Sequence, residues 1–412
     1  MGLKEVAGHY SSLKKGFEEL GIPSTFISLQ KHRFAYGGDD CKWVVRAIRW
    51  TGKPGTPKIF CSLKAPLMSM LFFWALFKHD IFIFSFKTSF FKNYRDLPIL
   101  KAFGKKIIYQ FHGSDSRPPY INGSVMAADK QMSIEECIKL AQRKKADLRL
   151  INQYADVIID TPQQGLFQER AFVLWLRVGL PNQCDPDLYE LPQNKPNGKL
   201  RILHCPSDLE AKGTPVIRKT ITQLIEEGLP IELVEVTGQK NHIVMSELKA
   251  CDIVVDQLYA DYGMPGFATE AAWFGKPVII GGYAKPEWDT LLPEELWPPT
   301  LYCHPDELAS AIRYLVENKD TRDALGQKAK QFVETYWRPH QVAQRYLDLA
   351  YGRLPAGWLY DPANIRYWQG CCFPETKVRE ILRQVIERGG VSALQLDDKP
   401  ELVKLMQQEA YR

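Results

Sequence analysis

Two stretches in the second half of the chain combine a predicted strand end, a short loop and a helix start. In the first, a strand is followed by the loop CPSDLEAKG, which places Lys212 and Gly213 directly before a helix. In the second, the loop that contains Gly263 and Gly266 leads into a helix that carries Glu270. Loops with little side-chain bulk allow backbone N–H groups to approach a ligand, and a helix N-terminus favours a phosphate. Both stretches therefore indicate a phosphate-binding site.

Each of these side chains also has a purely structural interpretation. Glu270, one turn into its helix, is able to accept hydrogen bonds from vicinal hydroxyls such as those of a ribose. It can equally be a helix-start acid that complements the helix dipole, which contributes about 0.3–1 kcal/mol. Lys212 is able to contact a diphosphate as a point charge, or it is simply a solvated lysine. The residues by themselves leave both alternatives open.

The first half of the chain contains a different pattern, a strand IIYQF that ends in the sequence His112-Gly-Ser-Asp115. A histidine at the carboxyl end of a strand can hydrogen-bond a substrate or manage a proton. Asp115 can then orient the histidine or contact the substrate, and Arg117 can meet an anionic group of a substrate. The structural alternative is a satisfied histidine beside an aspartate that caps a turn.

Short β-branched or aromatic runs alternate with helical segments along the whole chain, the pattern of βαβ units and parallel sheets. In the first half we expect strands at residues 24–29, 58–62, 80–86, 106–111 and 156–160 and helices at 11–20, 66–77 and 133–155. In the second half we expect strands at 200–205, 231–237, 252–257 and 278–281 and helices at 214–227, 241–250, 266–274, 305–318, 320–336 and 375–388. The fold class predicted is α/β, with two doubly wound Rossmann-like domains.

A turn-rich polar stretch, residues 185–198, marks the linker between the two domains. The predicted domains are residues 1–188, 189–340, and a mostly helical extension at 341–412. A doubly wound domain normally opens with a strand, and residues 1–6 hardly form one. Two alternatives are open: the first strand is absent, or the chain begins late relative to its relatives. Ligands in such sheets bind at the carboxyl ends of the strands, and the site is expected in a cleft that both sheets face.

Composition excludes several classes of protein. The chain has 412 residues, 45% of them hydrophobic and 25% charged, with a net charge of +5. Such a composition is that of a folded protein and excludes a disordered or collagen-like chain. Residues 1–150 contain 25 Lys and Arg against 12 Asp and Glu, which favours an anionic partner. Positive residues are dispersed and match no nucleic-acid-binding motif, so no nucleic acid is expected.

Cysteines and apolar runs indicate the compartment. Nine cysteines include no C-x-x-C pair, which favours reduced thiols in the cytoplasm over a zinc site or disulfides. The adjacent pair Cys371-Cys372 has a redox interpretation and a structural one. The longest uncharged apolar run, residues 65–77, is too short to span a membrane. It is expected to be a buried helix or, alternatively, a helix on the membrane surface, so the predicted location is cytoplasmic or peripheral at the inner face of the membrane.

Taken together, the segments HCPSDLEAKGT and DIVVDQLYADYGMPGFATEAAWFGKPVI resemble the donor half of GT-B glycosyltransferases of the retaining family 4 type. The resemblance covers about residues 80–350. It implies transfer of a sugar from a nucleoside-diphosphate sugar to a hydroxyl acceptor, with no cofactor and no metal. The residues to which it assigns donor binding are Gly8, Ser207, Lys212, Gly213, Tyr262, Gly263, Gly266, Thr269 and Glu270. His112 and Asp115 would be the catalytic pair beside the transferred sugar, and the implied acceptor is anionic or lipid-linked.

Two positions depart from the pattern of the family. The family usually has a glutamate eight residues before the ribose glutamate, and Tyr262 stands there; it commonly has an arginine where this chain has Ser207. These differences put the donor sugar and the second phosphate contact in doubt. They leave two alternatives open: a nucleotide-sugar epimerase of the same fold, or a non-catalytic GT-B module that binds a glycan or a protein partner.

Overall fold

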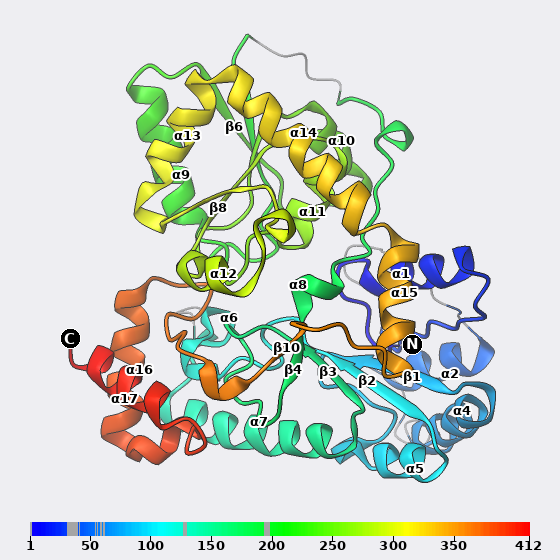
Figure 1. Ribbon diagram of the computed structural model, residues 1–412. Coiled ribbons are helices and arrows are strands. Elements are labelled where there is room, and N and C mark those ends of the chain that lie inside the picture. Colours follow the sequence, from blue (N-terminus) through cyan, green and yellow to red (C-terminus); the bar gives the residue numbers. More distant parts are fainter. Residues whose placement is uncertain are drawn as a thin grey trace. The chain divides into compact units, whose positions relative to one another are not determined.

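The computed structural model describes residues 2–30, 40, 42–53, 55, 57, 60, 62–126, 130–192 and 198–412. The chain divides into two compact units (Figure 1). The first unit comprises Met1–Ser116, Arg143–Pro181 and Pro339–Asn364. The second comprises Arg117–Gln142, Asn182–Arg338 and Ile365–Arg412. These units are groups of contacts, and the domain boundaries near residues 188 and 340 stay a prediction.

The first unit is built on a five-stranded sheet of order β1-β2-β3-β4-β10. Its strands are β1 Ile81–Ser85, β2 Lys106–Gln110, β3 Val157–Asp160, β4 Phe172–Leu174 and β10 Leu359–Tyr360. Strands β1 to β4 are parallel, and β10 pairs antiparallel with β4. Because a parallel sheet is covered on both faces, its strands are continuous apolar runs such as IFIF in β1, which is almost entirely buried.

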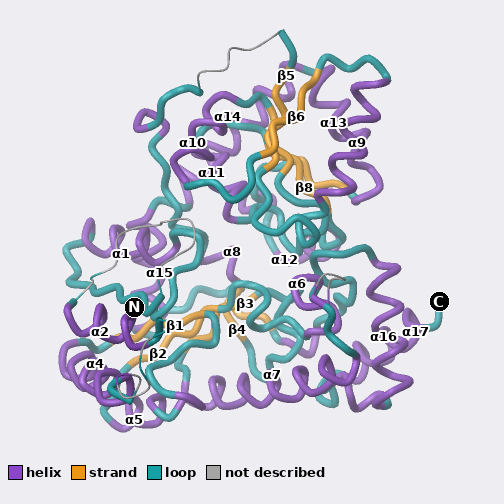
Figure 2. Tube along the Cα trace, turned by 180° about the vertical axis from the view of Figure 1, so that it is seen from behind, coloured by secondary structure: helices purple, strands orange, loops and turns teal. Residues whose placement is uncertain are grey.

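Helices cover both faces of this sheet (Figures 1 and 2). Those of the first unit are α1 His9–Glu19, α2 Trp43–Thr51, α4 Lys64–Lys78, α5 Asp96–Ala102, α8 Trp175–Val178 and α15 Pro339–Ala350. Helix α7, Ile134–Tyr154, starts in the second unit and continues into the first. Helices α5 and α7 lie on one face, and α1 with α15 on the other. Gly16 lets α15 approach α1, since a Cβ there would lie 2.1 Å from the carbonyl oxygen of Pro339.

The second unit repeats the plan with a sheet of order β6-β5-β7-β8-β9, in which all the paired strands are parallel. Its strands are β5 Leu200–His204, β6 Ile231–Glu235, β7 Ile253–Val255, β8 Val278–Gly281 and β9 Leu301–Cys303. Its helices are α6 Gly123–Met126, α9 Thr214–Glu226, α10 Asn241–Ala250, α11 Gly266–Trp273, α12 Lys285–Leu291, α13 Leu308–Glu317, α14 Lys319–Tyr336, α16 Glu375–Gly389 and α17 Pro400–Ala410. Helices α9 and α13 cover one face of the sheet, and α10, α11 and α14 the other (Figures 1 and 2).

The α/β class with two doubly wound, Rossmann-like sheets is therefore confirmed, and most predicted elements lie within a few residues of their expected bounds. The strand predicted at residues 24–29 is wrong: this segment is extended but is not part of a sheet. Its backbone-to-backbone hydrogen bonds within the described residues are isolated ones, from Leu29 N to the carbonyl oxygen of Leu3 and from Asp40 N to the carbonyl oxygen of Phe26. The strand predicted at 58–62 falls largely outside the described residues. No strand is assigned to residues 2–6, where Gly2 N donates to Ile83 O.

The predicted C-terminal extension is divided between the units: residues 341–364 belong to the first unit, and residues 365–412 belong to the second, together with residues 117–142. Helix α16 packs against α17 and against the turn Pro119–Ile121. The buried hydroxyl of Tyr120 donates to the carbonyl oxygen of Leu394, 2.8 Å away. In the part of the chain that the structure describes, no helix has the length and apolar character that a membrane span requires.

Candidate functional site

The predicted phosphate-binding loops lie side by side in the second unit. Strands β5 and β7 are neighbours and run parallel, with Leu203 paired to Val254, so the loops that follow them leave the same edge of the sheet. The loop after β5 carries Ser207, Lys212 and Gly213. The loop after β7 carries the residues from Tyr262 to Gly266. The contact that ties the loops together is the hydrogen bond from Leu258 N to the carbonyl oxygen of Lys212, at 3.1 Å.

The side chain of Lys212 is held at this edge by two partners. Its Nζ donates to Asp256 Oδ1 at 3.3 Å and to Gln257 Oε1. The Asp256 side chain is fully buried, and that of Lys212 is 20% exposed. An ammonium group has three donors, so two are used by the protein itself. Lys212 is therefore a positioned cation and not a freely moving surface lysine.

Gly213 is required by the path of the backbone. Its φ of +72° lies in the left-handed region, and it precedes the first residue of α9. A Cβ at this position would lie 2.7 Å from the Cβ of Leu258. A residue with a side chain would thus meet both backbone strain and a clash with the loop after β7.

His204, the last residue of β5, connects the end of β7 with the first residue of α9. Its Nδ1 lies 2.8 Å from the carbonyl oxygen of Val255, and its Nε2 lies 2.9 Å from the hydroxyl of Thr214. Because a carbonyl oxygen only accepts, Nδ1 carries the proton and Nε2 accepts from Thr214. Burial lowers the pKa of His204, which keeps the ring neutral. This histidine is a structural link and not a substrate group.

The N-terminus of α11 presents an uncapped helix end. Its N-cap residue, Pro265, makes no side-chain cap hydrogen bond, and the first helical bond runs from Thr269 N to Pro265 O. The Thr269 hydroxyl also donates a hydrogen bond to the carbonyl oxygen of Pro265, at 3.1 Å. The N–H groups of the first turn, which starts at Gly266, are therefore available to an anion.

Glu270 lies one turn into α11 and is only 6% exposed. Two thiols lie within reach of its charge: burial raises the pKa of Cys184 and Cys205, and the carboxylate of Glu270 raises both further. Burial also raises the pKa of the Tyr189 phenol, and the charge of Glu270 contributes in the same direction. A carboxylate removed this far from solvent is unusual for a residue that only complements the helix dipole.

The other predicted residues of this unit occupy distinct environments. Burial raises the pKa of the half-buried Tyr262, so its hydroxyl stays protonated and can serve as a donor. Gly263 accepts a hydrogen bond at its carbonyl oxygen from the Thr300 hydroxyl, 2.6 Å away. Ser207 is exposed, with no hydrogen bond that ties it to Lys212. Tyr262 and Gly263 are therefore part of the packed loop, whereas Ser207 lies on its surface.

A buried ion pair lies next to Tyr262. Arg117 is paired through Nη2 with Asp261 Oδ2, and both side chains are almost fully buried. Burial opposes the charge of Arg117, but the neighbouring thiols of Cys371 and Cys372 act in the opposite direction and the pKa of the guanidinium is raised. Arg117, which we expected to meet an anionic group, is thus paired with Asp261 inside the second unit.

In the first unit, His112 and Asp115 form a closed turn at the end of β2. The backbone N–H of His112 donates to Asp115 Oδ1 at 2.9 Å, so Asp115 caps the turn rather than contacting the imidazole. Nε2 of His112 is buried with no hydrogen-bond partner among the described residues. Burial lowers the pKa of His112 to about 4, and the ring is neutral at physiological pH.

Further polar groups gather near His112. The rings of His9 and His112 lie edge to face, 5.1 Å apart between centroids, and His9 Nε2 lies 3.2 Å from the Tyr346 hydroxyl. Burial raises the pKa of Asp160, at the end of β3, to about 7, although Gln164 and Gln168 donate to it. This buried polar cluster marks the carboxyl edge of the first sheet.

Gly8 lies in the first unit, away in the chain from the other predicted donor residues. It has a φ of +78° and precedes α1. The start of this helix is already satisfied, because the carboxylate of Glu5 accepts from the N–H groups of Tyr10 and Ser11 at 3.0 and 3.1 Å. The α1 N-terminus thus carries its own anion.

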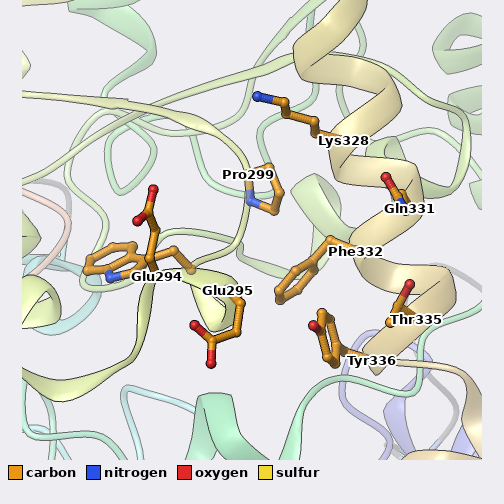
Figure 3. A pocket seen from close by; sticks show the side chains of 9 residues that line it. Glu294, Glu295, Pro299, Lys328, Gln331, Phe332, Thr335 and Tyr336 are labelled. Carbon is orange, nitrogen blue, oxygen red and sulfur yellow. The ribbon is translucent and has the colours of Figure 1, made fainter.

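One pocket of the second unit lies outside the predicted site residues, and no metal site is formed in the part of the chain that the structure describes. Among the described residues, no group of three or more His, Cys, Asp and Glu side chains has the geometry of a metal site. A pocket of about 530 Å³ in the second unit is lined by two glutamates and by aromatic residues of α14 (Figure 3). Its lining residues are Glu294, Glu295, Trp297, Pro299, Lys328, Gln331, Phe332, Thr335 and Tyr336.

Sequence reasoning missed the partners that hold the predicted residues. Asp256 and Gln257 were expected only as the end of a strand, yet they position Lys212. Asp261 was not singled out, although its carboxylate is fully buried against Arg117. Polar residues directly after an apolar strand are a usable signal for Asp256, whereas nothing in the local sequence indicates the pairing of Asp261 across 144 positions.

Comparisons with known proteins found similarity in structure only. A scan against protein-family models found no matching family, and a search of curated proteins found no matching relative. Among solved structures, Anabaena Alr3699/HepE in complex with UDP and glucose is 13% identical, with a TM-score of 0.42 over 70% of this chain and 82% of that one. A putative UDP-N-acetylglucosamine 2-epimerase from Listeria monocytogenes is 13% identical, with a TM-score of 0.45 over 86% and 96%.

The catalytic domain of starch synthase IV from Arabidopsis thaliana, bound to ADP and acarbose, is 11% identical, with a TM-score of 0.43 over 78% of this chain and 80% of that one. At such identities the similarity concerns the fold. At TM-scores below 0.5 it carries no argument about the activity of this chain.

Proposed function

We propose that this chain is a GT-B glycosyltransferase, which transfers a sugar from a nucleoside-diphosphate sugar to a hydroxyl acceptor with retention of configuration. The observation that supports this best is the edge of the second sheet, where the positioned cation Lys212, the uncapped start of α11 and the buried carboxylate of Glu270 come from adjacent loops. The sequence resemblance assigns the same three features to diphosphate and ribose.

In this proposal each group acts on a different part of the donor. The N–H groups at the start of α11 and the remaining donor of Lys212 bind the diphosphate. They stabilise the negative charge that develops on it as the sugar leaves. Glu270 accepts hydrogen bonds from the ribose hydroxyls. The neutral imidazole of His112 hydrogen-bonds a hydroxyl of the transferred sugar, and Asp115 holds the turn that presents it.

The experiment measures thermal stability of the purified chain with a panel of nucleoside diphosphates and nucleotide sugars. Donor binding is expected to raise the melting temperature, and Glu270→Ala is expected to abolish the increase. Glu294→Ala is the matched control, because it removes a glutamate of the same unit from a pocket outside the site. If no nucleotide changes the melting temperature of the wild-type chain, the proposal is wrong.

Product analysis distinguishes the proposed reaction from its alternatives. Transfer requires an acceptor and releases a nucleoside diphosphate in proportion to the glycoside formed. An epimerase converts the donor with no acceptor, and a non-catalytic module binds nucleotide without turnover. Mass spectrometry of donor, acceptor and released nucleoside diphosphate separates these three outcomes in one assay.

We further propose that the first unit docks on an anionic membrane surface, where a lipid-linked acceptor would lie. Helix α4 exposes an apolar stripe at a spacing of three and four residues: Leu63, just before the helix, then Pro66, Met70, Phe73 and Phe77. Trp43 and Trp50 are exposed on α2, which packs against α4. Residues 42–106 contain 13 Lys and Arg but 2 Asp. Apolar and aromatic side chains beside positive charge fit an anionic interface.

A further inference from the structure

The adjacent cysteines of the C-terminal extension lie at a crowded point of the second unit. The sulfur atoms of Cys371 and Cys372 are 3.2 Å apart, and both residues are free thiols. Cys371 is buried, whereas Cys372 is half-buried and its sulfur lies 3.5 Å from the hydroxyl of the exposed Ser124. One thiol of the pair is thus near the surface and the other behind it.

The backbone of the pair is clamped on two sides. Cys371 exchanges hydrogen bonds with residues 121–123, since its N–H donates to Ile121 O and its carbonyl oxygen accepts from Gly123 N. Cys372 N donates to Tyr259 O, in the loop that follows β7, at 3.1 Å. Cys372 has a φ of +73°, a conformation that a residue with a side chain adopts only when its surroundings impose it. The backbone of the pair is therefore held in place from two sides, with the two sulfur atoms in contact.

The charges around the pair favour an ionised thiol at one position. The hydrogen bond with Cys371 lowers the pKa of Cys372 to about 6, and the charges of Arg117 and Lys212 act in the same direction. The same hydrogen bond and burial raise the pKa of Cys371. The directions of these pKa shifts favour ionisation of Cys372 over Cys371, which is the arrangement of a reactive and a resolving cysteine.

We propose that Cys371 and Cys372 form an oxidisable dithiol site, which a small peroxide converts into a disulfide and a thiol reductant restores. The Cys372 thiolate attacks one peroxide oxygen, so that an S–O bond forms, the O–O bond breaks and the leaving oxygen departs as water after protonation. The sulfur of Cys371 then attacks the sulfenic sulfur of Cys372. An S–S bond forms, the S–O bond breaks, and the hydroxide leaves with the proton of Cys371 as a second water.

The overall change oxidises two thiols to one disulfide and reduces hydrogen peroxide to two waters. The sulfur atoms must approach from 3.2 Å to a bond length of about 2.05 Å. Their positions on consecutive residues make the second step intramolecular, so it is expected to outrun further oxidation of the sulfenic acid.

The test treats the full reduced chain with hydrogen peroxide and maps thiols by alkylation and mass spectrometry. In the wild-type chain the peptide with both cysteines is expected to lose two hydrogen masses and to regain them with dithiothreitol. In Cys371→Ser, which keeps a hydrogen-bond donor, a dimedone-type probe is expected to trap a sulfenic acid on Cys372. In Cys372→Ser, Cys371 is expected to stay a thiol. Cys303→Ser, at the end of β9, is the control and should behave as wild type.

Two results would overturn the proposal. One is a wild-type chain in which both thiols remain open to alkylation after peroxide has oxidised other cysteines. The other is a Cys372→Ser variant in which Cys371 reacts as fast as the wild-type pair. The first result needs no variant, so a variant that fails to fold does not prevent the test.

A second measurement rests on the proposed function. Lys212 is one of the positive groups that lower the pKa of Cys372, so a nucleoside diphosphate bound to Lys212 should raise that pKa and slow alkylation at least about fivefold. UDP, ADP and GDP are tested in parallel by calorimetry and by the alkylation rate. Binding without slower alkylation contradicts the coupling. No binding by any of the three contradicts the proposed function and leaves the peroxide result standing.

Discussion

Lys212 illustrates how a candidate binding residue depends on a partner that the local motif does not contain. Its ammonium is paired with Asp256, whose carboxylate is fully buried and keeps one oxygen, Oδ2, without a hydrogen bond among the described residues. Removal of one member of a buried pair leaves an uncompensated charge, which costs more than the pair contributes. A substitution at Lys212 therefore changes stability and binding together, and the two effects must be separated.

Lys212→Met is expected to lower the free energy of unfolding by about 3–5 kcal/mol, since the buried carboxylate of Asp256 loses its partner. It should also weaken diphosphate binding roughly 10- to 100-fold, the loss expected for one hydrogen bond to a charged group. The double variant Lys212→Met/Asp256→Asn should recover most of the stability but none of the binding. Denaturant unfolding and calorimetry measure the two effects. Recovery of binding in the double variant would contradict the role of Lys212.

Asp160 allows a test of pH dependence in the first unit. Burial raises its pKa to about 7, against hydrogen bonds from Gln168, Gln164 and the backbone of Thr161 and with a repulsive contribution from Asp115. Since the folded protein binds the proton more tightly than the unfolded chain, the stabilisation is complete below about pH 4. It is lost as the pH rises through 7.

Wild-type stability is therefore expected to fall by roughly 2–4 kcal/mol between pH 4.5 and 7.5 from this group, and Asp160→Asn should remove that part of the slope. Urea unfolding at a series of pH values measures it. Asp80→Asn is the control, because the Asp80 side chain is 93% exposed and should leave the slope unchanged. Equal slopes for wild type and Asp160→Asn would show that the carboxyl is not protonated in the fold.

Among the elements, helix α9 has a glycine directly before its first turn and another just after its last turn, and the surroundings of the two differ. Gly213 precedes the helix with a φ of +72° and lies against Leu258, whereas Gly228 follows it with a φ of +92° and nothing within 4 Å of an added Cβ. A residue with a side chain would meet the same kind of backbone strain at both positions. Only the first also lies in the contact between the two loops of the candidate site.

Gly213→Ala is expected to destabilise the chain by about 2–4 kcal/mol, from backbone strain and overpacking together. Gly228→Ala should cost about 1–2 kcal/mol, from strain alone. Nucleotide binding should weaken in the first variant and stay unchanged in the second. Thermal unfolding and calorimetry compare the pair. Similar effects of both substitutions would mean that the contact with Leu258 does not position the loop.

At the scale of the whole molecule, charge and exposed apolar surface are unevenly distributed. The candidate donor loops belong to the second unit, where one lysine and a helix end provide the positive groups. The first unit has a net positive charge, with 26 Lys and Arg against 14 Asp and Glu, and it carries the exposed apolar residues of α2 and α4. Net charge therefore indicates where an anionic surface would bind rather than where the diphosphate would.

Vesicle sedimentation tests this distribution. Wild-type protein is expected to bind vesicles that contain phosphatidylglycerol at low salt and to dissociate at high salt, since the attraction is screened. Phe77→Glu should reduce binding at least about tenfold. Leu188→Glu is the matched control, because Phe77 and Leu188 are both 75% exposed but Leu188 lies in the second unit. Equal loss in both variants, or no binding by wild type, would contradict the docking surface.

The sequence by itself determined the fold class, most element bounds and the loops of the candidate site. Periodicity and glycine signals act over a few residues, so local physics is enough to place β5, β7, α9 and α11. The strand predicted at residues 24–29 is wrong because strand formation depends on a partner distant in the sequence. Its apolar run is extended, but a strand also needs a ladder of hydrogen bonds to a neighbouring strand. Among the described residues this run makes only isolated backbone bonds, with Leu3 and with Asp40.

Only the tertiary structure decided which polar groups are paired. Asp256 with Lys212, Arg117 with Asp261, and Glu5 with the start of α1 are contacts that follow from how strands and loops are brought together. The closeness of Cys371 and Cys372 is visible in the sequence, but the clamp by Gly123 and Tyr259 is not. Because these groups are buried, the loss of one partner costs much more free energy than it would at the surface. Burial is a property of the packed chain, and no local sequence pattern contains it.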